Sequence, residues 1–259
     1  MLRMCCFGRG VWVAAVGLLA AVAVAGCGGS SGPGKSGANG GDPSAATGSG
    51  GGSGVVVSFA GNHVTRGMLA HWIPIEAVLQ RDLTPQEPPA PGEVPDPPAY
   101  KACIGFQMSV VPAGEPTPSA AQAKQECEQR YHQIRTHMLE LLIDYDWTEA
   151  EANAHAIRIT PQEFQRTWAR DKREVFGSEA VFQKYLHATG ETLADELKIV
   201  RFDMQAIDLR EKILHEHGVP ALRQFGHQYP RELKAKTSCS PGYITPDCKQ
   251  YTGSQQPEG

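Results

Sequence analysis

The sequence lacks any cluster of basic residues. Its 24 Lys and Arg are dispersed along 259 residues and are outnumbered by 28 Asp and Glu, which gives a formal net charge of −4. Proteins that bind nucleic acid concentrate Lys and Arg where they contact phosphates, and surfaces that bind anionic lipid headgroups do the same. The sequence therefore predicts neither a nucleic-acid partner nor a headgroup-binding surface.

The motifs of common catalytic and metal sites are also missing. The chain has no H-E-x-x-H, and its strings of the G-x-S-x-G, P-loop and G-x-G-x-x-G types all fall within residues 28–37 of a Gly/Ser-rich segment, where no predicted strand precedes them as these motifs require. It has no C-x-x-C pair of the kind that zinc sites use. His215 and His217 lie two residues apart, so their side chains diverge on a helix, and His132 and His137 are spaced equally poorly for shared ligation. We expect no catalytic residue, no cofactor and no metal site.

No hydrophobic run is long enough to span a bilayer. The longest, residues 11–26, has 16 residues, whereas a transmembrane helix needs about 20. It follows Arg3 and Arg9, as in a secretory signal peptide. The run ends in V-A-G-C at Cys27, which resembles the bacterial lipobox, whose Cys becomes the lipidated first residue of the mature protein. The resemblance implies that residues 1–26 are a signal peptide and that the protein is lipid-anchored to the extracytoplasmic face of the cell membrane. The alternative is an ordinary signal peptide with a chance Cys.

Residues 28–54 contain 12 Gly and 6 Ser among 27 residues and no large apolar side chain. Such a segment cannot bury a core, and its composition predicts a flexible linker. We therefore divide the chain into a signal peptide, the lipidated Cys with its linker (27–54), a helical domain (55–236), and a disulfide-closed loop and tail (237–259).

Four cysteines remain after Cys27. They are Cys103, Cys127, Cys239 and Cys248. An even number in an exported domain favours two disulfides. Three pairings exist, of which the local one, Cys103–Cys127 with Cys239–Cys248, closes the shortest loops; free buried thiols are the alternative.

Periodicity and capping signals predict a mostly α fold with one or two short N-terminal strands. A β-branched run at 55–59 precedes a turn and a helix from Thr65, which Pro74 should kink or end early. Seven Pro in residues 84–98 predict an extended loop before a short helix that carries Cys103. Further helices are expected at 119–154, 160–177, 178–190, 192–218 and 221–236.

The penultimate helix has an apolar stripe at steps of three and four residues, which is the spacing of one helix face. Its members are Leu193, Leu197, Val200, Met204, Ile207 and Leu214. The break after it is expected at Gly218-Val219-Pro220.

Two stretches carry a family resemblance. Residues 55–72, VVVSFAGNHVTRGMLAHW, resemble the opening of SurA-like and PrsA-like foldases, although the turn is Gly61-Asn62 where those have Asn-Gly. Residues 160–213, from TPQEF to LREKI, resemble the helices that follow in the family. The segments PDPPAYKACI and SCSPGYITPDCKQY are similar to actinobacterial lipoproteins of this group. The resemblance implies an irregular multi-helix domain like the SurA N-terminal domain.

The same resemblance implies a function. Family members usually carry an additional parvulin domain with the peptidyl-prolyl isomerase site, but only 40 residues follow Val219 and they lack its Gly-rich motif. We therefore expect a membrane-anchored extracytoplasmic chaperone that binds unfolded exported polypeptides, without isomerase activity. The alternatives are a peptidyl-prolyl cis-trans isomerase and a structural envelope lipoprotein with one specific partner.

Client binding requires exposed apolar side chains that tolerate many sequences, a task that Met and aromatic residues suit. The alternative for each such residue is a place in the core. The candidates are Met68, Trp72, Phe106, Met108 and Trp168.

Overall fold

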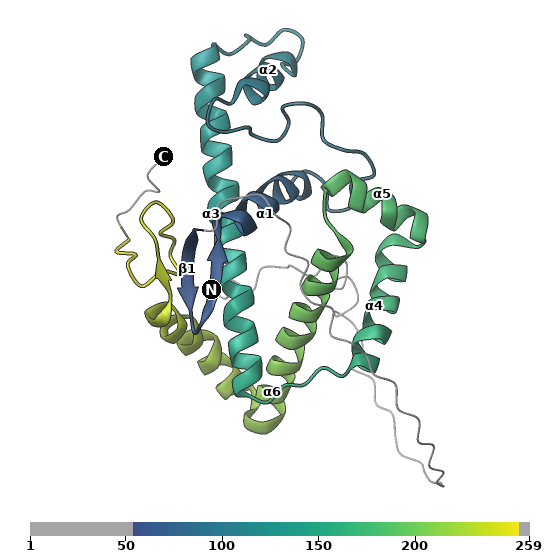
Figure 1. Cartoon of the computed structure of the whole chain (residues 1–259), viewed down its shortest axis with the longest axis vertical. Helices are drawn as coiled ribbons and strands as arrows, with labels where there is room; N and C mark the ends of the chain where they lie inside the picture. The colour runs from purple at the N-terminus through teal and green to yellow at the C-terminus, as the bar shows by residue number, and fades with distance from the viewer. Residues whose placement is uncertain (1–53, 254–259) are drawn as a thin grey trace.

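The computed structural model of the protein describes residues 54–253, and this part is mostly helical (Figure 1). The elements follow one another as β1 (Val55–Phe59), β2 (Asn62–Thr65), α1 (Arg66–Leu79), α2 (Lys101–Ser109), α3 (Ala120–Ala154), α4 (Pro161–Phe176), α5 (Glu179–Thr189), α6 (Leu193–Lys236) and β3 (Ser238–Cys239). The expected mostly α fold with short strands is confirmed. Within 54–253, no helix combines the length and the hydrophobicity that a membrane crossing requires.

The three strands form one small antiparallel sheet in the order β2-β1-β3. β1 and β2 join through Ala60 and Gly61, both with positive φ, a conformation that Gly adopts readily. β3 pairs Cys239 with Val57, and the Ser240 N–H donates to the Val56 carbonyl at 2.8 Å. Residues 237–259 were expected to form a disulfide-closed loop and tail, and Cys239 and Cys248 of this segment lie in the same buried core as β1.

Helix α3 is the spine of the molecule (Figure 1). It begins at a capping box in which Ser119 and Gln122 satisfy each other's backbone N–H groups. Its buried residues include Ile134, Met138 and Leu142, which pack against α1 and the sheet as the helical spacing predicts. Helix α2 covers one end of α3, and α6 runs along the other.

Helix α1 does not end early at Pro74, which corrects one of the two expectations for that residue. The helix continues to Leu79, and Pro74 itself is exposed. Pro removes one backbone hydrogen bond from a helix. The residues after it, Ile75, Ala77 and Val78, are all buried, and this packing holds the last turns in helical form.

Both disulfides have the local pairing. Cys103–Cys127 ties α2 to α3 with a Cα–Cα distance of 6.1 Å, and Cys239–Cys248 closes the loop after β3 at 5.7 Å. These distances are ordinary for disulfides. The local pairing predicted from the loop lengths is therefore confirmed.

Helix α6 consists of two helical segments that meet at Gly218. This residue has φ 76° and ψ 179°, outside the helical region, and Pro220 follows two residues later. The break predicted at Gly218-Val219-Pro220 is confirmed. In Figure 1 the segment after the break turns back toward the sheet, where it leads into β3. Leu233 is buried at this end, and Thr237 immediately before β3 is fully buried.

Candidate binding surface on helix α6

Several polar contacts at its N-terminus hold the first segment of α6 in position. Thr192 and Asp195 form a capping box, and the Asp195 carboxylate also lies 3.0 Å from Nε2 of His71 on α1. Just before the cap, the buried Tyr185 hydroxyl donates to Glu191 at 2.7 Å. One long face of α6 then packs on α3, with Phe202 against Tyr145 at a ring-centroid distance of 4.2 Å. The opposite face is consequently turned away from α3.

Half of the residues in the apolar stripe predicted on this segment are exposed to solvent. Val200 is buried, and Leu197 and Met204 are half-buried. Leu193, Ile207 and Leu214 are exposed, with relative accessibilities of 48%, 49% and 41%. The side chains that α6 uses for its core contacts include Leu209 and Ile213, which lie outside the predicted stripe. The spacing thus identified the apolar face but not the fact that solvent reaches it.

Another exposed apolar residue lies just beyond the break in α6. Val219 directly follows Gly218 and is 50% exposed. Ile207 and Leu214, seven residues apart, therefore present large apolar groups on one face of the first segment, and Val219 adds an exposed apolar group just beyond the break. Single exposed apolar side chains are common on proteins, but an aligned set is typical of a surface that binds an apolar partner.

Helix α4 borders the stripe. Phe164 of α4 is buried and its ring lies 4.8 Å from the guanidinium of Arg201 on α6. Trp168, one turn later, is half-buried between Phe182, with a centroid distance of 5.4 Å, and the Lys172 ammonium. On the side of the stripe next to α4, the rings of Phe164 and Trp168 therefore have the charged groups of Arg201 and Lys172 over their faces.

The five predicted client-binding residues differ in how exposed they are. Trp72 is buried at 6% accessibility and packs in the core, so its assignment to a client surface is wrong. Met68 and Phe106 are half-buried, and Met108 on α2 is exposed. Met108 lies on α2, which packs on α3, whereas Trp168 lies on α4, which packs on α5 and α6, so the two do not belong to one patch.

Cys27, the predicted lipidation site, lies outside the described residues, as do the signal peptide and nearly all of the linker. The surface that the sequence reasoning missed is the one on α6 around Ile207, Leu214 and Val219. The sequence did contain one indication of this surface, the apolar stripe, which reaches Leu214 close to the Gly218 break. The charged residues between the stripe positions, such as Asp208 and Arg210, do not indicate whether another helix packs on it.

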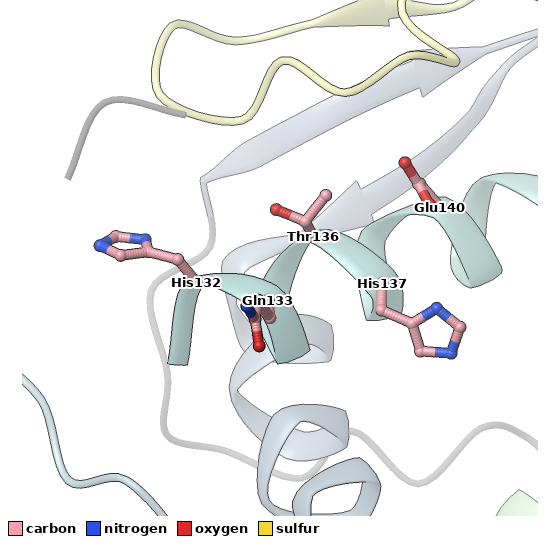
Figure 2. A pocket seen from close by; sticks show the side chains of 5 residues that line it. All are labelled: His132, Gln133, Thr136, His137 and Glu140. Carbon is pink, nitrogen blue, oxygen red and sulfur yellow. The ribbon is translucent and has the colours of Figure 1, made fainter. Parts of the chain in front are cut away.

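A hollow of about 360 Å³ lies along α3 (Figure 2). Its described lining consists of His132, Gln133, Thr136, His137 and Glu140. Figure 2 shows the imidazoles of His132 and His137 pointing away from each other, so they cannot share a ligand. His132 Nδ1 is buried and has no hydrogen-bond partner within 54–253. Burial, with a contribution from Arg135, lowers the pKa of His132, and this favours the neutral ring.

The arrangement of titratable groups supplies no catalytic set in the described region. Asp146 on α3 has its pKa raised to about 6 by burial, although nearby Lys198 lowers it. A perturbed carboxyl becomes a candidate for catalysis only beside a nucleophile or substrate site. Among residues 54–253, no three His, Cys, Asp or Glu converge as metal ligands.

Comparison with protein-family models, with curated proteins and with solved structures finds no match to this chain.

Proposed function

We propose that this protein is a membrane-anchored chaperone that binds unfolded exported polypeptides through the exposed apolar stripe of α6. The observation that carries the proposal is the exposure of Ile207 and Leu214 on one face of α6, followed by exposed Val219 beyond the break, each more than 40% exposed, on a helix that packs on α3. A rigid apolar face can bury apolar side chains of many different sequences, because the hydrophobic effect is non-directional.

The proposed activity is to keep unfolded proteins from aggregating, not to isomerise prolyl peptide bonds. The purified full chain, in lipid nanodiscs, should slow the aggregation of several unrelated chemically unfolded secreted proteins, as followed by light scattering. It should leave the cis/trans exchange of a prolyl peptide at its uncatalysed rate, with a time constant of tens to hundreds of seconds. Empty nanodiscs are the control.

Two results would contradict this prediction in different ways. Acceleration of prolyl exchange well above background would favour the isomerase alternative. Protection of one protein but not of unrelated ones would instead favour a structural envelope lipoprotein with a specific partner.

The proposal includes lipidation of Cys27, motivated by the V-A-G-C motif and the Gly/Ser-rich segment that follows it. Cys27→Ala should shift the protein from the membrane fraction to the soluble fraction, since no acceptor thiol remains at the motif. Phase partitioning in detergent, with Cys6→Ala as the matched control, measures this. A Cys27→Ala variant that still partitions into detergent like the wild type would rule out the anchor.

A further inference from the structure

A second hollow, of about 220 Å³, lies where the C-terminal segment of α6 meets the end of α3. Its lining comprises Glu151, His155, Phe225, Gln228, Tyr229, Glu232 and Leu233. It is separate from the α3 hollow of Figure 2 and shares no described residue with it. Its volume suits the end of one long side chain rather than a large ligand.

Aromatic rings form one wall of this hollow. Phe225 and Tyr229 are stacked, with centroids 4.7 Å apart and an interplanar angle of 28°. The His155 ring meets Phe225 edge-on at 6.4 Å. The faces of aromatic rings carry negative electrostatic potential and attract Lys and Arg side chains. Phe225 and Tyr229 are both half-buried, so each ring keeps part of its surface open to a ligand.

Two carboxylates from different helices complete the lining. Glu151 on α3 approaches Nε2 of His155 at 3.9 Å, and the side chain of Glu232 on α6 forms neither a hydrogen bond nor an ion pair with any residue of 54–253. Burial raises the pKa of Tyr229, a hydrogen bond with Thr148 lowers it, and the negative charges of Asp144 and Glu151 raise it. The hollow therefore combines aromatic surface with negative potential and leaves one carboxylate available.

We propose that this hollow binds the cationic end of a Lys or Arg side chain. An organic cation fits better than a metal ion, because a hard cation needs several converging oxygens and the described residues hold no such group. The ligand's side chain would belong to a polypeptide bound on the α6 stripe, so the proposal rests on the proposed function. Val219 lies six residues before Phe225, about 9 Å along the helix, a distance that an extended bound segment of about three residues spans.

The test uses N-acetyl-arginine methylamide as the probe and its citrulline analogue, which has nearly the same shape without the charge. Binding to the full chain in nanodiscs is measured by ligand-observed NMR titration. We expect saturable binding of the arginine probe, at least about fivefold tighter than that of the citrulline analogue. Phe225→Leu and Glu232→Gln should each weaken arginine binding by about threefold to tenfold. Glu126→Gln, at an exposed glutamate near the other end of α3, is the matched control and should change nothing.

An uncharged apolar peptide, labelled for fluorescence anisotropy, keeps the two proposals distinguishable. If this peptide binds and the arginine probe does not, the cation site is wrong and the proposed function stands. If the probe binds and the peptide does not, the cation site stands and the chaperone proposal fails. Equal binding of the arginine and citrulline probes, or unchanged arginine binding in Glu232→Gln with native circular dichroism, would overturn the cation site.

Discussion

Replacing Trp147 by Ala should lower the free energy of unfolding by about 3–5 kcal/mol, the usual range for truncating a buried Trp. Trp147 on α3 has a relative accessibility of 2% and is among the largest fully buried side chains. It meets Phe59 of β1 edge-on at 6.4 Å and Tyr229 of α6 at 6.2 Å. The side chain therefore joins the spine helix to both the sheet and the last helical segment.

A hydrogen bond adds to this packing. The Trp147 indole N–H donates to the Thr237 hydroxyl at 2.8 Å, and that hydroxyl donates in turn to the Leu233 carbonyl at 2.8 Å. Both groups are buried, and a buried polar group that loses its partner costs about 1–3 kcal/mol. Thr237 immediately precedes β3, so this relay fixes the point at which the chain leaves α6 and enters the sheet.

Guanidinium unfolding followed by far-UV circular dichroism measures the loss. Trp168→Ala is the matched control, because Trp168 is only half-buried and should cost distinctly less. Amide exchange supplies a second readout: the Ser240 N–H, which donates to Val56, should lose protection in Trp147→Ala and keep it in Trp168→Ala. Equal losses of stability in the two variants would show that Trp147 does not have this linking role.

The helix starts could be predicted because their signals are local. Thr160 with Glu163 and Thr192 with Asp195 satisfy backbone N–H groups within one turn, and the structure has both capping boxes. The break at Gly218 is equally local, since Gly tolerates the positive φ there and Pro220 cannot continue a helical hydrogen bond. Such features depend on neighbours in sequence and not on the fold.

The third strand could not be predicted. Ser238–Cys239 has two residues, too few for an alternating pattern, and it forms because the edge of β1 opposite β2 is free to pair. Contact between residues 57 and 239 is a property of the whole chain path. The expected early end at Pro74 was wrong for a similar reason, because burial of the following residues outweighed a local preference.

Exposure was the least predictable property of the candidate site. Val200 and Ile207 occupy the same stripe at helical spacing, yet Val200 is buried and Ile207 is exposed. Trp72 and Trp168 are the same residue type on amphipathic helices, yet only Trp72 is enclosed in the core. Periodicity reports which residues share a face, while the packing of other elements decides how much of that face is covered.

The double substitution Ile207→Ser with Leu214→Ser should weaken binding of an uncharged apolar peptide by about thirtyfold. Burying a whole Ile or Leu side chain is worth about 1.5–3 kcal/mol, and each of these side chains is already partly covered. About 1 kcal/mol per residue therefore remains to be gained on binding, and about 2 kcal/mol for the pair corresponds to that change in Kd. Fluorescence anisotropy with the full chain in nanodiscs measures it.

Stability provides the check that the surface, and not the fold, has changed. Both side chains are exposed, and surface substitutions usually alter stability by less than about 0.5 kcal/mol, so the unfolding midpoint should stay near that of the wild type. Leu83→Ser is the matched control, because Leu83 is 63% exposed on the loop after α1 and lies outside the stripe. If Leu83→Ser weakens peptide binding as much as the double variant, general surface hydrophobicity explains the binding. If the double variant binds like the wild type, the α6 stripe is not the client surface, because the peptide can bury nothing at these two positions after the apolar side chains are gone.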